Sequence, residues 1–368
     1  MSEPRSLYWE DVTEGVALPV IEYELSLLRL VAMVRATGLY DYVHFDRDYA
    51  RAAGARDVFA STPHTLGLFA RLLTEWSGPG ADIRSITLRM RSSCCAGDLL
   101  RISGKVGRKW LEERDGAVEC LVEIVDLVIA HQHAAEASLA TAVLALPSRA
   151  HGPVRTGLVP SPAAPAQLGP DVPEFARTLV GSVIEGPPEP RRPLTADEIL
   201  LWCEALEDWN PLYWDEAYAR GQRHGGVIAP APAMFHGANS ATVLGLGVRK
   251  PGGVVPEPVR QGLTGMPLLQ ALRKEFVAHA APFAIAGFPE IAVAEARSDY
   301  YRPMRPGDTG RTTQQVLDCS ALKKTRLGEG YFLKWVRAVS NQHGQLVRTF
   351  TVTGFVYRTV VVAPATAG

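Results

Sequence analysis

The sequence contains two copies of one pattern, and this repetition constrains the fold more than any other feature. Residues 41–51 read Asp-Tyr-Val-His-Phe-Asp-Arg-Asp-Tyr-Ala-Arg, and residues 210–220, which lie 169 positions later, read Asn-Pro-Leu-Tyr-Trp-Asp-Glu-Ala-Tyr-Ala-Arg. Further along, residues 97–98 match residues 307–308 (Gly-Asp in both) at a spacing of 210 positions, so the second copy carries about 41 additional residues. We therefore expect two similar domains in this chain of 368 residues.

Each copy shows the same order of predicted elements. A helix comes first, and in the second copy Thr195 and Glu198 form a capping-box pattern at its start. A polar-aromatic loop and a small helix follow, then a central apolar helix and four strands with period-2 or continuous apolar runs. The predicted helices are 26–37, 62–76, 195–206 and 232–244, with small helices ending near Arg51 and Arg220, and the predicted strands are 83–89, 99–106, 118–130, 137–146, 292–300, 310–316, 331–340 and 346–357. This order predicts an α+β fold in which an antiparallel sheet wraps around a central helix in each copy.

A change of composition marks the boundary between the copies. Residues 147–193 are rich in Pro, Ala and Gly, which is typical of an extended, semi-rigid linker. We expect an N-terminal domain at 1–148, a linker at 149–192 and a C-terminal domain at 193–361. The additional residues of the second copy form an insertion at about 243–288.

Charge and cysteine content exclude several classes of protein. The chain has 38 Lys and Arg against 39 Asp and Glu, which gives no electrostatic reason to expect a nucleic-acid or membrane partner. Its start lacks the pattern of a signal peptide, and its most apolar window, 120–130, is interrupted by Glu123 and Asp126. Five cysteines without CxxC or Cys/His spacing argue against a disulfide framework and a structural zinc site. We expect a soluble, cytoplasmic protein that needs no metal, flavin or nicotinamide.

The loop after the first helix of each copy resembles the hallmark segment of the MaoC-like hydratases and dehydratases, relatives of the (R)-specific enoyl-CoA hydratases. That segment reads Gly-Asp-x-Asn-Pro-x-His-x-Asp. The second copy keeps Asp208, Asn210 and Pro211 but has Tyr213 where the family has His. The first copy keeps its Gly and has His44, but it has Leu39 where the family has Asp. The resemblance implies a tandem, or double, hotdog fold whose two copies pack side by side and whose sheets join edge to edge.

The resemblance also implies which side chains act. In the family the Asp and His hold one water molecule, and a backbone N–H at the start of the central helix holds the thioester oxygen. Neither copy carries the intact Asp/His pair, so a site in the first copy, a site in the second copy and a composite of both stay open. The candidate catalytic residues are His44, Asp41, Asp208 and Tyr213, and the candidate substrate-binding residues are Asn210, Thr62, Ala231 and His64.

Several of these residues also have a purely local interpretation. Asp46 and Asp215 each precede a small helix and are expected to be N-caps. Asn210 is expected to tie down the loop backbone in an Asx turn. His44 and His64 also fit as structural histidines.

The function that the resemblance implies is hydration of an enoyl thioester or dehydration of a 3-hydroxyacyl thioester, linked to CoA or to a carrier protein. In similar family members the region of the insertion at 243–288 accommodates bulky acyl groups, so the resemblance implies a bulky acyl group of the kind found in secondary metabolism. One alternative is a divergent hotdog enzyme that catalyses cyclisation or isomerisation of a polyketide-like product. Another is a non-catalytic partner subunit of a hydratase. Candidate partners are the small acyl thioester, an acyl carrier protein and a second copy of the chain.

Overall fold

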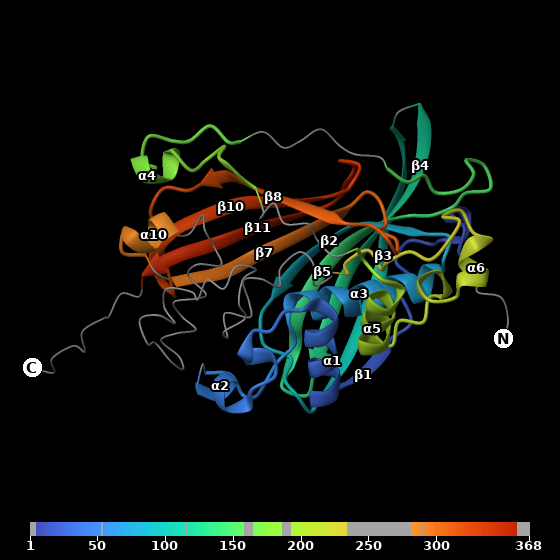
Figure 1. Cartoon of the computed structure of the whole chain (residues 1–368), viewed down its shortest axis with the longest axis horizontal. Helices are drawn as coiled ribbons and strands as arrows, with labels where there is room; N and C mark the ends of the chain where they lie inside the picture. The colour runs from blue at the N-terminus through green and yellow to red at the C-terminus, as the bar shows by residue number, and fades with distance from the viewer. Residues whose placement is uncertain are drawn as a thin grey trace, which may run out of the picture.

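The computed structural model describes residues 5–52, 54–114, 116–157, 165–185, 193–233, 281–288 and 290–358, and within them a single eleven-stranded sheet runs through the molecule (Figure 1). Helices α1 (Leu27–Thr37), α3 (Thr62–Ser77) and α5 (Ala196–Leu206) lie together below this sheet in the view of Figure 1. The predicted α+β class and antiparallel pairing of the named strands are confirmed.

The strands of the first half follow the order β1-β3-β4-β5-β2, and those of the second half follow the equivalent order β6-β8-β10-β11-β7. Each named strand of the first half thus has a counterpart in the second, as the internal repeat predicts. In the first half the strands are β1 (Ile21–Leu25), β2 (Asp82–Met90), β3 (Asp98–Arg114), β4 (Ala117–His131) and β5 (Ala134–Ala145). In the second half they are β6 (Val183–Glu185), β7 (Glu290–Tyr300), β8 (Gly310–Cys319), β10 (Gly328–Asn341) and β11 (Leu346–Arg358), with the short β9 (Lys323–Thr325) beside β10.

The two halves join through β2 and β7, which pair antiparallel with Ser85 opposite Asp299 and Leu88 opposite Ala296. The expectation that the two sheets meet edge to edge is therefore confirmed. Such pairing removes one exposed edge from each half, where free N–H and C=O groups would otherwise invite aggregation.

Helix α3 is the central helix of the first half, and almost every residue from Pro63 to Leu73 is buried. Ser61 caps its start by accepting the N–H of His64. Gly67 lets α5 approach closely, because a Cβ at this position would lie 2.4 Å from Leu206 Cδ1 and 3.1 Å from Trp202 Cζ2. The central helix of the first half thus packs on the first helix of the second half.

The predicted first helices are confirmed, and so is the capping box of the second one. Helix α1 begins after the N-cap Ser26, and α5 begins with the predicted capping box of Thr195 and Glu198. The small helices α2 (Arg47–Ala52) and α6 (Glu216–Arg220) also match. The predicted helix at 232–244 and most of the insertion at 243–288 lie outside the described residues, apart from α10 (Ala281–Ile285) and the turn that follows it.

Among the described residues, strands β1, β6 and β9 and helices α4 (Glu174–Arg177) and α10 were not predicted. Strand β1 alternates buried and exposed residues and pairs with β3. Within the segment expected to be a linker, the structure has the short helix α4 and strand β6, which pairs with β8. Part of this segment therefore belongs to the second sheet.

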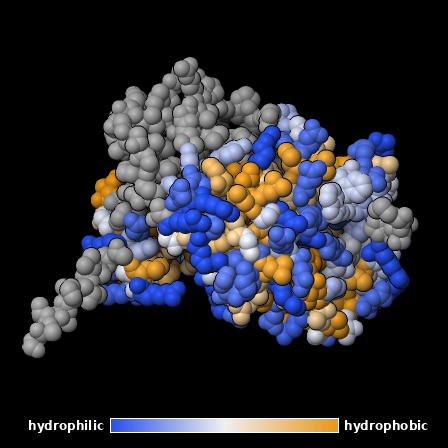
Figure 2. Space-filling model, turned by 90° about the horizontal axis from the view of Figure 1, so that it is seen from below, coloured by the Kyte–Doolittle hydropathy of each residue, from blue (hydrophilic) through white to orange (hydrophobic). Residues whose placement is uncertain are grey.

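Apolar side chains are exposed on the underside of the molecule, where α1 and α5 lie. Leu28 is 76% exposed, and Val31, Leu200, Trp209 and Trp214 also reach the solvent. Seen from below, orange apolar areas alternate with blue hydrophilic ones (Figure 2). None of the described helices has the length and hydropathy that a membrane span requires.

Candidate functional site

Both hallmark loops begin with a residue in the left-handed conformation. Gly38 ends α1 with a φ of 63°, and Glu207 ends α5 with a φ of 56°. Glycine adopts this conformation without penalty, whereas another L-residue costs roughly 1–2 kcal/mol. The second copy therefore keeps a glutamate at a strained position immediately before Asp208.

The carboxylate of Glu207 binds two arginines of the first half. It pairs with Arg29 of α1, and Arg71 Nη1 of α3 lies 3.4 Å from its second oxygen. Arg71 Nη1 also donates to the carbonyl of Leu206 at 2.9 Å. These contacts offset the backbone strain at Glu207 and fix the end of α5 against the first half.

Asp208 is buried, with 1% of its surface exposed. Its N–H donates to Cys203 O at 2.9 Å, which completes a Schellman-type helix end. One carboxylate oxygen accepts the Asn210 N–H at 3.4 Å. Burial raises the pKa of Asp208 to about 7, and the negative charge of Glu75 adds to the rise while Arg71 opposes it. A carboxyl group with this pKa can release or accept a proton near neutral pH.

Asn210 and Tyr213 complete the loop of the second copy. The Asn210 side-chain oxygen accepts the Leu212 N–H at 3.1 Å, so the expected Asx turn is confirmed. Burial raises the pKa of the Tyr213 hydroxyl well above its usual range, and the charge of Asp208 adds to the rise, while a hydrogen bond from the Asn210 side chain opposes it. Tyr213 is therefore a neutral phenol, able to donate a hydrogen bond, in the same buried environment as Asp208.

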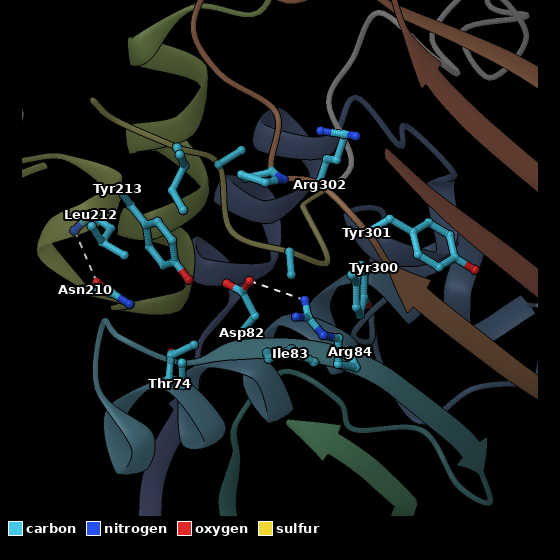
Figure 3. A pocket seen from close by; sticks show the side chains of 15 residues that line it. Thr74, Asp82, Ile83, Arg84, Asn210, Leu212, Tyr213, Tyr300, Tyr301 and Arg302 are labelled. Carbon is cyan, nitrogen blue, oxygen red and sulfur yellow. Dashed lines mark hydrogen bonds and ion pairs between the residues drawn. The ribbon is translucent and has the colours of Figure 1, made fainter. Parts of the chain in front are cut away.

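A pocket opens beside this loop, between the two halves (Figure 3). The second copy supplies the hallmark loop, the segment before the predicted central helix and the end of β7, whereas the first copy supplies the end of α3 and the start of β2. The lining residues are Thr74, Ala81, Asp82, Ile83, Arg84, Asn210, Leu212, Tyr213, Ile228, Ala229, Ala231, Tyr300, Tyr301, Arg302 and Pro303. Three of the sequence-predicted site residues, Asn210, Tyr213 and Ala231, thus meet in one pocket that is a composite of both halves.

Ala231 lies at the start of the segment that leads into the second central helix. Its neighbours Pro230 and Pro232 have no N–H to donate. Among the described residues no acceptor is paired with the Ala231 N–H, whereas the Ala233 N–H is bonded to Pro230 O at 3.0 Å. Within the described part of the chain the Ala231 N–H is thus a candidate donor to a ligand oxygen.

The first copy arranges its hallmark residues differently. His44 is buried, and its Nδ1 donates to Phe59 O at 2.8 Å. In the neutral ring this bond leaves the lone pair on Nε2. The Asp41 carbonyl accepts the His44 N–H, but the Asp41 side chain does not cap this turn (Tyr42–His44). The structure thus keeps Asp41 and His44 in one turn, joined by the backbone.

His64 and Thr62 lie at the start of α3. His64 has no exposed surface, and its Nε2 lies 3.3 Å from the Tyr23 hydroxyl. Burial lowers the pKa of His64 to about 3, and the nearby His44 contributes to this shift, so the ring is neutral. The Thr62 hydroxyl contacts Met90 S at 3.9 Å. His64 thus packs against Tyr23 in the core of the first half.

The two repeated aspartates have the local role that the sequence predicts. Asp46 accepts the Tyr49 N–H at 3.0 Å, and Asp215 accepts the Tyr218 N–H at 2.9 Å. Both carboxylates therefore serve the small helices as N-caps.

Sequence reasoning missed the charged residues that line the pocket. Asp82 and Arg84 come from the start of β2, and Arg302 follows β7. Nothing in the local pattern around Asp82 distinguishes it, and residues 302–308 (Arg-Pro-Met-Arg-Pro-Gly-Asp) stand out only as a turn. Within the described part of the chain, no group of three or more His, Cys, Asp or Glu side chains is placed to hold a metal ion.

The raised pKa of Asp208 predicts a pH-dependent stability. The carboxyl titrates near its ordinary value of 3.8 in the unfolded chain and at about 7 in the folded protein. Below about pH 4 the carboxyl is neutral in both the folded and the unfolded protein and carries no penalty. As the pH rises from there through 7, the unfolded chain loses its proton more readily than the folded protein, so the free energy of unfolding falls. Asp208→Asn removes this penalty, so the variant should gain on the order of a few kcal/mol over wild type between pH 4 and pH 8. Urea unfolding at both pH values measures the gain, and parallel pH profiles for the two proteins would contradict it.

Comparison with known proteins places these features in context. A family model described as "FAS1-like, dehydratase domain region" matches residues 179–256, a range that contains Asp208, Tyr213 and Ala231. The chain is 31% identical over 181 residues to a Thermomonospora curvata protein named probable enoyl-CoA hydratase alpha subunit, covering 49% of this chain and 50% of that one. The chain thus spans about half the length of this relative. It is also 37% identical over 92 residues to the 3-oxo-4,17-pregnadiene-20-carboxyl-CoA hydratase beta subunit of Mycobacterium tuberculosis, covering 25% of this chain and 71% of that one.

Two solved structures share the fold. A MaoC domain protein from Chloroflexus aurantiacus superposes with a TM-score of 0.63 at 12% identity, covering 97% of this chain and 99% of its own. A Mycobacterium tuberculosis protein described as having a double hotdog fold superposes with a TM-score of 0.56 at 14% identity, covering 95% and 98%. The predicted double hotdog fold is therefore confirmed.

Proposed function

Because this chain belongs to the MaoC-like family of dehydratases and enoyl-CoA hydratases, we propose that it is a hydro-lyase that adds water to a trans-2-enoyl-CoA or removes water from a 3-hydroxyacyl-CoA. The observation that carries this proposal is a pocket lined by Tyr213 and Ala231, whose N–H has no acceptor among the described residues, with Asp208 buried in the same loop behind the lining residues. These groups supply the three functions that the reaction needs: a base, a proton donor and a hydrogen-bond donor to the thioester oxygen.

The roles follow from the chemistry of each group. In hydration, ionised Asp208 takes a proton from water as the water oxygen forms a bond to C3 of the substrate. The electron pair of the double bond moves toward the thioester oxygen, which the Ala231 N–H holds. Tyr213 then donates a proton to C2, which completes the addition. Asp208 passes the proton that it took from water to Tyr213, so both groups return to their starting states. Turnover in the hydration direction should rise with pH through about 7, since Asp208 must be ionised.

We place the reacting centre in the second copy. The first copy has Leu39 in place of Asp208, and its His64 packs in the core against Tyr23. His44, oriented by Phe59 O, is the alternative base, with Asp41 in the same turn. The activity of His44 and Asp208 variants distinguishes the two sites.

We further propose that the acyl group is bulky and that the chain works with a second subunit. The relatives are named as alpha and beta subunits of hydratases, and one of these enzymes acts on a 3-oxo-4,17-pregnadiene-20-carboxyl-CoA. Tyr213 and Tyr300 line the pocket and offer aromatic surface to an acyl group. A chain that only completes the site of another subunit would turn over nothing until that subunit is added.

A spectroscopic assay tests the proposal. Hydration of a conjugated enoyl thioester removes its absorbance, so trans-2-enoyl-CoAs with linear and cyclic acyl groups give a direct reading. We expect turnover, and we expect Tyr213→Phe to lower kcat by about 10- to 100-fold because the proton donor is lost. Tyr218→Phe, which changes a tyrosine of the small helix α6, is the matched control and should retain the wild-type rate. A folded protein that is inactive with every thioester would contradict the proposal.

A further inference from the structure

Three charged side chains line the pocket, and among the described residues Asp82 and Arg84 form ion pairs whereas Arg302 does not. Arg84 binds Glu119 at 2.6 Å and Asp82 at 3.3 Å. Asp82 in turn binds Arg223 at 2.5 Å. These four side chains are two arginines, an aspartate and a glutamate, so their charges sum to zero.

Arg302 stands outside this network. Arg302 lines the same pocket, and among the described residues its guanidinium forms no ion pair and no hydrogen bond. Figure 3 shows this guanidinium at the edge of the group of lining side chains, turned away from Asp82 and Tyr213. Its Nε is shielded from solvent without a hydrogen-bond partner. Arginine stays charged at any physiological pH, and a partly buried charge without a partner is unfavourable. An anionic ligand would remove this penalty.

The position of Arg302 is fixed by close packing. Gly157 has a φ of 84°, and a Cβ at this residue would lie 2.5 to 2.8 Å from three atoms of the Arg302 guanidinium. The Gly157 N–H donates to Tyr301 O at 2.8 Å, and the Arg302 N–H donates to Val347 O at 3.2 Å. The guanidinium is thus held beside the pocket before a ligand arrives, which lowers the entropy cost of binding.

We propose that Arg302 binds a carboxylate carried by the acyl chain, so that the substrates are enoyl thioesters with a second, free carboxyl group. This inference rests on the proposed function, because it places the acyl chain in the pocket beside Tyr213. The phosphates of CoA are a second source of anionic oxygen, but the whole pantetheine arm separates them from the thioester. A group that reaches Arg302 within the pocket of Tyr213 therefore belongs to the acyl side. Arginine also suits a carboxylate, because its planar fork can donate two parallel hydrogen bonds.

Calorimetry with unreactive ligands tests this assignment independently of turnover. The probes are a saturated ω-carboxyacyl-CoA and its methyl ester, measured with wild type, Arg302→Met and Arg302→Lys. We expect wild type to prefer the free acid by about 10-fold or more, because the methyl ester cannot form the charge-assisted pair. Arg302→Met should abolish this preference, and Arg302→Lys should keep part of it. Circular dichroism checks that both variants are folded.

Pantetheine thioesters of the same two acyl groups lack the CoA phosphates, so they show whether Arg302 binds the acyl carboxylate or a phosphate. If Arg302 binds the carboxylate, its loss abolishes the preference with or without the CoA phosphates. If Arg302→Met weakens both CoA ligands equally and leaves both pantetheine ligands unchanged, Arg302 binds phosphate and the assignment is overturned. An equal affinity of wild type for acid and ester also overturns it. An Arg302-dependent preference in a protein without turnover would instead refute the hydro-lyase proposal alone.

Discussion

Replacing Asp208 with asparagine is expected to lower kcat by about 10²- to 10⁴-fold, because the amide can neither take a proton from water nor return it. Asparagine has nearly the shape of aspartate and still accepts the Asn210 N–H, so the loop keeps its geometry. Initial rates with a trans-2-enoyl-CoA measure the loss.

Asp215→Asn is the matched control for this change. Asp215 caps α6, and asparagine caps a helix as well as aspartate does, so the rate should stay near that of wild type. Equal losses of rate in the two variants would show that activity depends on any carboxylate in this loop. That result would contradict the role of Asp208 as the base.

Trp202→Ala is expected to destabilise the protein by about 3–5 kcal/mol, because it removes the largest side chain of α5 from the core. Trp202 is fully buried, and its ring lies against Gly67 of α3, where the two halves pack together. The same helix leads into Glu207 and Asp208, so the variant should also lose activity at temperatures where it is still largely folded.

The free energy of unfolding in urea checks this second effect. Leu200→Ala, on the exposed side of the same helix, is its control and should change that free energy by about 0.5 kcal/mol or less. A small effect of Trp202→Ala would mean that the contact between the halves adds little to stability.

The sequence predicts most of the fold because the signals are local and occur twice. Caps at Ser26 and Thr195, and long segments rich in apolar residues such as β4, are visible without any tertiary information. Strand β6 escaped prediction because it has three residues and lies in a Pro-rich segment, where its pairing with β8 decides its conformation. Strand β1 shows the alternation of a strand, but its five residues are a weak signal without β3 beside it.

The candidate site was predictable only in part, for a physical reason. Asp208, Asn210 and Tyr213 share one short loop, so the sequence groups them. Asp82 and Arg302 lie 220 positions apart and line one pocket only because β2 pairs with β7. Burial is the main cause of the raised pKa of Asp208, and α3 of the other half contributes the charge of Glu75, which adds to the rise.

The central claim is that the second copy holds the reacting centre, and one comparison tests it most directly. The loss of enoyl-thioester absorbance is followed for wild type, Asp208→Ala and His44→Ala under identical conditions. We expect Asp208→Ala to abolish turnover and His44→Ala to retain most of it. Turnover that His44→Ala abolishes and Asp208→Ala spares would place the site in the first copy and contradict this account.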